Sequence, residues 1–211
     1  AAAVGEFLLY LPFVCKAVAD QMVPVYAGSF WGGCDPAVND LLELPCDPSG
    51  DEQPIGEVYL SFYEIYKYEV SNLQYRACVA AGYCTPPQSI ESFTRTDYFT
   101  NPAYNNYPVV NVTWDQADTY CGWVGKRLPT EAQWEKAARG SADARVFPWG
   151  NDLPTCSLAN FFDTDQNQYC SSDLDPDTME VSSFTAGTSP YGALNMSGNV
   201  WEWVNDWYSA T

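Results

Sequence analysis

The sequence predicts an α+β fold with little regular secondary structure, in which short helices and strands are joined by long loops and held by disulfides. Three observations support this prediction. Helix-start signals recur along the chain, two stretches alternate apolar and polar residues as strands do, and eight cysteines accompany long segments rich in Pro, Asn and Asp. At 211 residues and 46% apolar composition, the chain is long enough to bury one sizeable core as a single domain.

The charge balance excludes several classes of function. Nine basic and twenty-seven acidic residues give a formal net charge of -18, which repels the phosphates of nucleic acids and anionic lipids alike. We therefore expect no nucleic-acid partner and, since there is no long apolar run, no membrane-spanning helix. Histidine is absent, which removes imidazole catalysis and histidine-based zinc or iron sites. The acids suit divalent cations, or they simply form the solvated surface of a secreted protein.

The cysteine content indicates an oxidising compartment, so the expected location is secreted, periplasmic or at the cell surface. No C-x-x-C pair occurs, which leaves zinc ribbons and thioredoxin-type redox motifs without support. Short loops favour three local disulfides: Cys34 with Cys46, Cys78 with Cys84, and Cys156 with Cys170. Cys121 falls in an amphipathic helical pattern, where a free buried thiol is common, and a bond between it and Cys15 is an open alternative.

Residues 1–20 differ from the rest of the chain and are predicted to form an N-terminal arm or docking segment. They contain a short apolar run, Glu6–Cys15, without the basic region that an intact signal peptide carries. Such a segment can dock on another subunit, or it can add a strand or helix to its own domain, and the sequence favours neither.

Two strand regions are expected before the first helix. Met22–Trp31 alternates apolar residues and contains Gly28, which suits a strand and a turn. Glu57–Tyr66 alternates aromatic and aliphatic residues with polar ones, which is typical of a half-buried strand. Between them, Gly32–Gln53 is rich in Asp and Pro and is predicted to be an acidic loop pinned by its own disulfide.

Three helices are predicted by the same start signal, a capping box in which a hydroxyl at the N-cap and Gln at N3 satisfy free backbone amides. The pairs are Ser71 with Gln74, Thr113 with Gln116 and Thr130 with Gln133, and the expected C-caps are Gly82, Gly125 and Gly140. In the third helix Trp134 and Ala138 face one side, and core packing is the expected role of Trp134. The segments Cys84–Asn106 and Ser141–Asp177 are predicted to be mostly irregular.

The stretch Gly192–Trp207 concentrates aromatic rings, glycines and asparagines and is predicted to be a buried structural knot. Its side-chain and main-chain oxygens have a spacing that suits calcium, with Trp201 and Trp203 anchoring the flanks. The candidate ligands are the side chains of Asn195 and Glu202 and the main-chain carbonyls of Gly198 and Val200. The alternative is that Asn195 and Asn199 only satisfy the backbone of a turn.

Five motifs carry a resemblance to a known family and occur in that family's order. They are Met22–Trp31, Tyr68–Tyr75, Gly125–Arg139, Phe147–Asn151 and Asn195–Trp203, the last of which contains G-N-V-W-E-W. The chain resembles the formylglycine-generating enzyme, or sulfatase-modifying factor, family. This resemblance implies that residues 21–211 form a C-type-lectin-like mixed fold, stabilised by calcium, in a secreted or lumenal setting.

The resemblance also implies a second calcium site. In the family it is held by an asparagine that follows an alanine, by its neighbour's carbonyl and by an aspartate ahead of a T-x-x-V strand, here Thr178–Val181. The matching positions are Asn160, Phe161 and Asp173, with Asp175 as the alternative acid because of an insertion around Cys170. Without the resemblance, the acidic residues of this region predict only a solvated loop.

The chain departs from the family at the residues that carry its chemistry. Formylglycine-generating enzymes oxidise a substrate cysteine with a copper-binding pair of cysteines that lies well beyond the G-N-V-W-E-W motif. Here eight residues follow Trp203, and none is cysteine. The domain over residues 21–211 is therefore expected to be C-terminally incomplete, and copper is not expected as a cofactor.

Two classes of function follow, and a third is weaker. The first is a non-catalytic, calcium-stabilised binding or structural module, a subunit of an extracellular or periplasmic assembly. Its protein partners would dock on residues 1–20 and the open C-terminal end, for example by strand addition. The second is a copper-dependent formylglycine-generating oxidase acting on sulfatase cysteines, with its end absent from this sequence. The third is a carbohydrate-binding module, whose tyrosines and tryptophans would stack on sugar rings.

Overall fold

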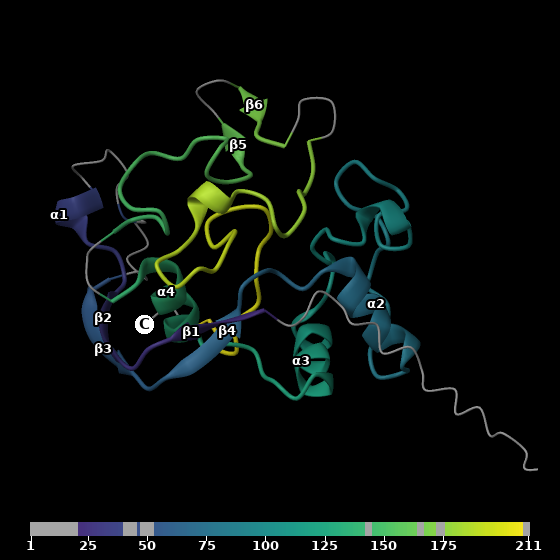
Figure 1. The fold of residues 1–211 in the computed structure, drawn as a ribbon, viewed down its shortest axis with the longest axis horizontal. Helices are drawn as coiled ribbons and strands as arrows, with labels where there is room; N and C mark the ends of the chain where they lie inside the picture. Colours follow the sequence, from purple (N-terminus) through teal and green to yellow (C-terminus); the bar gives the residue numbers. More distant parts are fainter. Residues whose placement is uncertain are drawn as a thin grey trace, which may run out of the picture.

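The structure, a computed structural model, describes residues 21–39, 46, 53–141, 145–163, 167–171 and 176–208. The arm expected over residues 1–20 lies outside these ranges. Figure 1 shows short helices and two-stranded ribbons joined by long loops, which confirms the predicted α+β class with little regular structure. Within the described ranges, no helix is long and apolar enough to cross a membrane.

A long, bent antiparallel ribbon opens the domain (Figure 1). In it β1 (Met22–Val25) pairs with β4 (Tyr63–Tyr66), and β2 (Gly28–Gly32) pairs with β3 (Gly56–Leu60). The bend falls between the two strand pairs. Pairing is interrupted at Tyr26–Ala27 in one arm of the ribbon and at Ser61–Phe62 in the other arm. The prediction of a single strand over residues 57–66 is therefore wrong, because this segment forms two strands separated by the bend.

A buried lysine holds the bend. Lys136, in α4 (Glu131–Arg139), has no exposed surface. Its Nζ donates hydrogen bonds to the carbonyl oxygens of Tyr26 at 3.0 Å and Gly28 at 2.6 Å. Buried carbonyls need a hydrogen-bond donor, and in a continuous strand pair the partner strand would supply it. At the bend, Lys136 supplies the donor for these two carbonyls instead.

The three longer helices begin where the capping boxes predict. They are α2 (Asn72–Ala80), α3 (Trp114–Trp123) and α4. In each one the N-cap hydroxyl, from Ser71, Thr113 or Thr130, accepts from the N3 amide, and the N3 glutamine accepts from the N-cap amide. The predicted glycines lie directly at or after the last turns with positive φ, at Gly82, Gly125 and Gly140. The predicted starts are therefore confirmed. Gly140 is the C-cap of α4 as predicted, whereas the C-caps of α2 and α3 are Ala81 and Val124, one residue before the predicted glycines.

Among the described residues, the remaining regular elements are short. They are α1 (Pro36–Asn39), the hairpin of β5 (Phe162–Asp163) with β6 (Gln168–Tyr169), and two 3-10 helices at Pro102–Tyr104 and Thr185–Gly187. Thr178–Val181, expected to be a strand, is irregular. The amide of Val181 donates to the carbonyl of Asn106 at 2.9 Å, which is a contact between two loops rather than part of a ladder.

Two apolar clusters form the core. One packs α2 against α3 and contains Tyr75, Cys78, Cys84, Phe99, Tyr120, Cys121 and Leu128. The other packs α4 against β1 and contains Val23, Val25, Ala137, Ala138, Ala193 and Met196. Trp134 packs against the second cluster, as predicted. The C-terminal loop thus enters the core through Ala193 and Met196.

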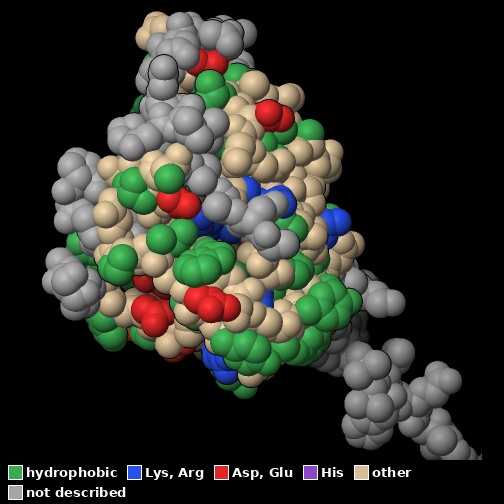
Figure 2. Space-filling model, turned by 90° about the vertical axis from the view of Figure 1, so that its left-hand side faces the viewer, with side chains coloured by type: hydrophobic (Ala, Val, Ile, Leu, Met, Phe, Trp, Pro, Cys, Tyr) green, Lys and Arg blue, Asp and Glu red, His purple; other side chains and the backbone are tan. Residues whose placement is uncertain are grey.

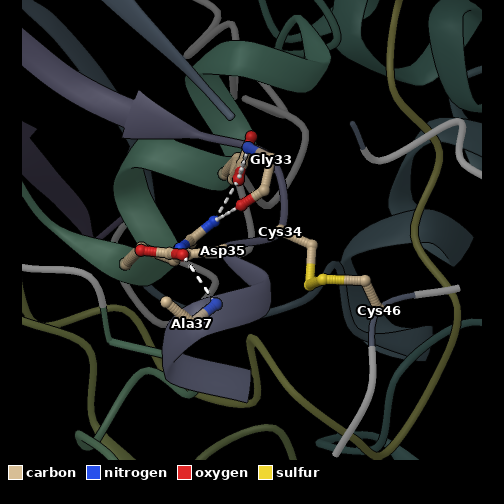
Figure 3. Close-up of a disulfide and its surroundings, with 7 residues drawn as sticks. Gly33, Cys34, Asp35, Ala37 and Cys46 are labelled. Carbon is tan, nitrogen blue, oxygen red and sulfur yellow. Dashed lines mark hydrogen bonds and ion pairs between the residues drawn. A yellow bond between two sulfur atoms is a disulfide. The ribbon is translucent and has the colours of Figure 1, made fainter. Parts of the chain in front are cut away.

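All three predicted disulfides are present: Cys34–Cys46, Cys78–Cys84 and Cys156–Cys170. Figure 3 shows the first of them beside Gly33, whose amide donates to the Glu135 carboxylate of α4 at 2.8 Å. Cys121 is a free, buried thiol, whereas Cys15 lies outside the described residues. Multiple disulfides indicate an oxidising, extracytoplasmic environment.

The C-terminal stretch is only partly the buried knot that its composition predicts. Asn195 and the apolar residues on either side of it are buried. Trp201, Trp203 and Trp207 instead keep 102%, 49% and 86% of their surface exposed. Residues 201–208 have no helix or strand and run along the surface. Trp201 therefore does not anchor the loop, whereas the indole nitrogen of Trp203 donates to the carbonyl of Val112 at 3.0 Å.

Candidate metal centre

The centre is built around an acid for which the sequence suggested no role. Glu69 lies between β4 and α2 and is 9% exposed. Its two carboxylate oxygens accept from the side-chain amides of Asn199 and Asn195, each at 2.8 Å. Burial raises the pKa of Glu69, although the two amide donors act in the opposite direction. A charged group at the entry to a helix, flanked by apolar residues in sequence, was the signal that could have identified it.

Asn195 presents a free acceptor. The residue is 7% exposed and adopts a left-handed φ of 57°, which asparagine tolerates. Its Nδ2 donates to Glu69 and, at 3.1 Å, to the carbonyl of Val181. Its Oδ1 is buried without a hydrogen-bond partner among the described residues. Since an unsatisfied buried acceptor costs free energy, this oxygen is a natural ligand for a cation.

The two carbonyl candidates lie in a tight turn. The amide of Val200 donates to the carbonyl of Gly198 at 2.9 Å, which leaves that oxygen a second lone pair. Gly198 has a φ of 148°, and a Cβ there would meet the carbonyl oxygen of Asn160 at 2.8 Å. Glycine therefore allows the loop carrying the first set of candidate ligands to touch the loop carrying the second.

Glu202 is the fourth candidate ligand of the first site. Its Oε2 accepts from the indole nitrogen of Trp134 at 3.0 Å. Trp134 therefore does more than pack in the core, because it also positions a candidate ligand. Desolvation by the surrounding protein and the nearby charge of Glu69 raise the pKa of Glu202 to about 7, although the residue as a whole is exposed to solvent.

A cavity of about 330 Å³ lies next to part of this set. Glu69, Val200 and Glu202 line it together with apolar side chains of β4 and the core. Asn195 is hydrogen-bonded to Glu69 at the same place. The described residues contain no group of three or more His, Cys, Asp or Glu side chains that could hold a metal, so a cation there would need amide and carbonyl oxygens.

This donor set fits calcium. It supplies an unsatisfied amide oxygen, two carbonyls and one carboxylate, all of them oxygens of the kind that calcium binds in flexible loops. The adjacent Glu69 adds negative charge without using its own oxygens for a ligand, because both accept from asparagines. Asn195, Gly198, Val200 and Glu202 are therefore the residues that would hold the ion.

The second predicted site is described only in part. Asn160 Nδ2 donates to the carbonyl of Asp177 at 3.0 Å and to Asn199 Oδ1 at 3.1 Å. The carbonyl of Phe161 accepts from the amide of Cys170 at 2.9 Å. Asp173 and Asp175 lie outside the described residues. The structure therefore places Asn160 beside the first site and leaves the acid of the second untested.

Asp177 contradicts the expectation that the acids of this loop are solvated. It is 8% exposed. Its carboxylate accepts from both Ser92 and Thr94 and from the amide of Thr178, the last at 2.7 Å. Burial acts to raise its pKa, but these donors outweigh burial, and the pKa of Asp177 lies below its ordinary value. The residue joins the 92–94 loop to the loop that carries the second candidate site.

Comparisons with known proteins agree with the resemblance. Residues 12–211 match the family of sulfatase-modifying factor enzyme 1-like domains. Formylglycine-generating enzyme from Thermomonospora curvata is 33% identical over 240 residues, which cover 92% of this chain and 74% of that protein. Inactive C-alpha-formylglycine-generating enzyme 2 from Bos taurus is 40% identical over 107 residues, which cover 49% of this chain and 34% of that protein.

A solved structure gives the same result for the fold. PvdO from Pseudomonas aeruginosa matches 90% of this chain with a TM-score of 0.64 and 26% identity, and this chain covers 71% of it. The relatives include one named as an enzyme and one named as inactive, so they leave catalysis by this chain open. Together with the motifs and the loop-rich fold, these matches show that the chain belongs to the sulfatase-modifying factor family.

Proposed function

We propose that this chain is a calcium-stabilised binding or structural module of its family. The observation that carries the proposal is the buried, unpartnered Oδ1 of Asn195, beside Glu69 and next to a loop that ends in Glu202. Calcium on Asn195, Gly198, Val200 and Glu202 would fasten this loop to the core. A second ion would be held by Asn160, Phe161 and Asp173, or by Asp175 in place of Asp173.

Chelation tests the calcium proposal. A ligand that binds only the folded state stabilises it by about 2.7 kcal/mol at a concentration of 100 Kd. For a domain of this size each kcal/mol shifts Tm by about 2–4 °C. We expect EGTA to lower Tm by roughly 5–10 °C and calcium to restore it.

Glu202→Gln should abolish most of this calcium response. The matched control is Glu57→Gln, which removes the same charge at an exposed position of β3 and should respond to calcium as the unaltered chain does. An unchanged melting curve in EGTA would show that hydrogen bonds alone hold the loop.

The described cysteines support a role other than oxidation. Six of them form disulfides, and the seventh, Cys121, is buried with its pKa raised to about 11 by burial and by the charge of Asp118. Copper(I) selects thiolate ligands, and these groups do not fit a copper-binding pair. The oxidase alternative therefore requires thiols other than the described ones.

A direct assay separates the module from the oxidase. The purified 211-residue chain should bind no copper tightly and should convert no cysteine to formylglycine in a peptide that carries the sulfatase motif. Aldehyde product, or one copper ion per chain, would overturn the proposal. The catalytic thiols would then have to be sought at Cys15 and Cys121.

A protein partner is the ligand class that the surface supports best. Four aromatic residues of the C-terminal segment are exposed; we call Trp201, Trp203, Trp207 and Tyr208 the C-terminal aromatic surface. Exposed clusters of tryptophan and tyrosine are typical of protein interfaces. We propose that subunits of an extracellular or periplasmic assembly dock there and on residues 1–20.

Carbohydrate is the second candidate ligand. Trp31 and Tyr59 project from the outer face of β2 and β3 with 50% and 67% of their surface exposed. Hydrophobic and acidic side chains lie together on the face shown in Figure 2. Titration with oligosaccharides, followed by tryptophan fluorescence in the chain and in Trp31→Ala, would detect stacking on this face. An unchanged signal would leave the protein partner as the remaining candidate.

A further inference from the structure

The orientation of the Asn195 side-chain amide decides whether this residue can bind an ion in the first candidate site. Its Oδ1 is buried without a hydrogen-bond partner among the described residues, and it is the only side-chain atom of Asn195 that can serve as a ligand. Its Nδ2 donates to Glu69 at 2.8 Å and to the carbonyl of Val181 at 3.1 Å. A flipped amide would place Oδ1 against these two acceptors and turn its NH₂ group toward the ion.

Glu69 is the stronger of the two acceptors. Each of its carboxylate oxygens receives an amide hydrogen, one from Asn195 and one from Asn199, which is the geometry of an ionised carboxylate. A hydrogen bond to a charged acceptor is roughly twice as strong as one between neutral groups. Because Glu69 is buried, water competes little for these oxygens. Glu69 is therefore the main restraint on the amide of Asn195.

Asn199 fixes the other side of Glu69. Its Nδ2 also donates to the carbonyl of Met179 at 3.2 Å. Its Oδ1 accepts from the amide of Met179 at 2.8 Å and from Asn160 at 3.1 Å. These contacts orient the Asn199 amide independently, with its NH₂ group toward Glu69. One carboxylate oxygen of Glu69 is thus held in place, and the other is left facing Asn195.

We propose that Glu69 is a positioning residue of the first calcium site, which keeps the oxygen of Asn195 available to the ion without binding the ion itself. The inference rests on the calcium site of the proposed function. Residues that orient a metal ligand from outside its coordination shell commonly change metal affinity by about 10-fold to 100-fold when they are substituted. The charge of Glu69 alone would also attract a cation, and substitutions that keep the charge separate the two roles.

Glu69→Gln removes the charge and reverses one hydrogen bond. The new NH₂ group must face an asparagine NH₂ group, either that of Asn195 or that of Asn199. Among the described residues, Asn195 is held besides Glu69 only by the Val181 carbonyl, so we expect its amide to turn. Calcium affinity, measured by calorimetry, should fall by about 10-fold or more.

Glu69→Asp keeps the charge and breaks the hydrogen bond. The shorter side chain draws the carboxylate back by about 1.5 Å, the length of one carbon–carbon bond, which is beyond hydrogen-bond reach of Asn195. We expect calcium affinity to fall by about 10-fold or more, as in Glu69→Gln. Unaltered affinity in Glu69→Asp would show that only the charge matters and would overturn the positioning role.

A double-mutant cycle tests whether Glu69 acts through Asn195. Asn195→Gly removes the ligand oxygen and accepts the φ of 57° found at this position. In that background Glu69→Asp has no amide to release and should change the affinity for terbium, used as a tighter-binding probe of calcium sites, by less than about 2-fold. Equal weakening in the two backgrounds would overturn the positioning role.

Terbium luminescence adds a readout that a general loss of stability would not reproduce. The difference between its decay rates in H₂O and D₂O counts the water molecules bound to the ion. When the oxygen of Asn195 turns away, water should take its place. Glu69→Gln, Glu69→Asp and Asn195→Gly should therefore each add about one water molecule per ion.

Controls separate this inference from folding defects and from the proposed function. Glu57→Gln, with the same loss of charge at an exposed position of β3, should match the unaltered chain in affinity and water count. Melting curves in EGTA identify any variant that does not fold, and Glu69→Asp retains the test if Glu69→Gln is one of them. Calcium binding that no Glu69 variant changes would overturn this inference alone. Absence of calcium binding by the unaltered chain would overturn the proposed function together with it.

Discussion

At the scale of single residues, buried polar side chains carry much of the structure. Asp177 accepts from Ser92, Thr94 and Thr178 and so joins two loops that share no regular element. Each hydrogen bond to a charged group contributes about 1.5–3 kcal/mol, more than an ordinary one. In a domain with short helices and strands, such residues replace the ladders that would otherwise connect its parts.

Asp177→Asn should make the protein less stable and less sensitive to acid. The amide puts NH₂ against donors of the 92–94 loop, so we expect a loss of about 2–3 kcal/mol at pH 7 in urea unfolding. The pKa of Asp177 is lowered by folding, so its contribution is present above the ordinary aspartate pKa and is lost as pH falls toward the lower folded value. The variant should therefore lose less stability than the unaltered chain below about pH 4. Asp152→Asn, at an exposed position, is the control and should change neither quantity.

Cys121 should resist alkylation in the folded protein. Burial and the charge of Asp118 raise its pKa to about 11, and only the thiolate reacts. Iodoacetamide at pH 8 should label the Cys121 peptide slowly in native protein and quickly in urea, as measured by mass spectrometry. Above about pH 9 the unfolded thiol ionises first, so rising pH favours unfolding up to the folded pKa. Rapid native labelling at pH 8 would show that the thiol is accessible and ionised.

At the scale of elements, α4 is the connection between distant parts of the chain. Lys136 holds the bend of the ribbon, and Trp134 holds Glu202. The first amide of the helix, on Glu131, donates a hydrogen bond to the carboxylate of Asp206 at 2.6 Å. One helix of three turns or fewer thus positions the N-terminal ribbon, the candidate metal loop and the C-terminal segment relative to each other.

Thr130→Ala should weaken this connection. The hydroxyl of Thr130 caps the helix by accepting from the amide of Gln133 at 3.2 Å, and loss of such a cap costs about 0.5–2 kcal/mol. We expect Tm to fall by roughly 1–8 °C, because each kcal/mol shifts Tm by about 2–4 °C at this size. Thr130→Ser retains the hydroxyl and should restore most of the loss. Equal losses in the two variants would assign the effect to the methyl group and not to the cap.

The helices and disulfides were predictable because their determinants are local. A capping box spans four residues, and the three disulfides close loops with separations of 6, 12 and 14 residues. The break between β3 and β4 was not predictable, since it depends on Lys136, a residue far along the chain. The role of Glu69 depends in the same way on asparagines 126 and 130 residues away. The spacing of the first candidate ligands pointed to the Gly192–Trp207 stretch, but it could not show that Trp201 is exposed.

At the scale of the whole molecule, covalent links compensate for sparse secondary structure. Each disulfide that closes a loop of this size contributes about 2–4 kcal/mol. The three lie in different regions: the acidic loop after β2, the end of α2, and the irregular segment around β5 and β6. The domain therefore depends on an oxidising compartment for a substantial part of its stability.

The disulfides should be reduced in an order set by burial. Cys78 is fully buried and Cys84 nearly so, whereas Cys156 and Cys170 are half-buried. Under increasing dithiothreitol, the Cys156–Cys170 bond should open first and the Cys78–Cys84 bond last, as followed by alkylation and peptide mapping. Mapping without reduction should recover all three pairs. Recovery of Cys78 as a free thiol would contradict the local pairing.

The hydrogen bonds of Glu69 also have a consequence for the order of folding. This acid finds its partners only when residues 195 and 199 reach it, and ribosomes add about 5–20 residues per second. If the chain folds during synthesis, roughly 6–26 s pass between the synthesis of Glu69 and that of its two asparagine partners. During this time the buried charge beside the ribbon and α2 lacks these hydrogen bonds. Contacts so distant in sequence form late on the folding route, because closing a long loop is costly before other contacts are made. An ion bound beside Glu69 and Asn195 would then mainly lower the unfolding rate and would leave the folding rate nearly unchanged.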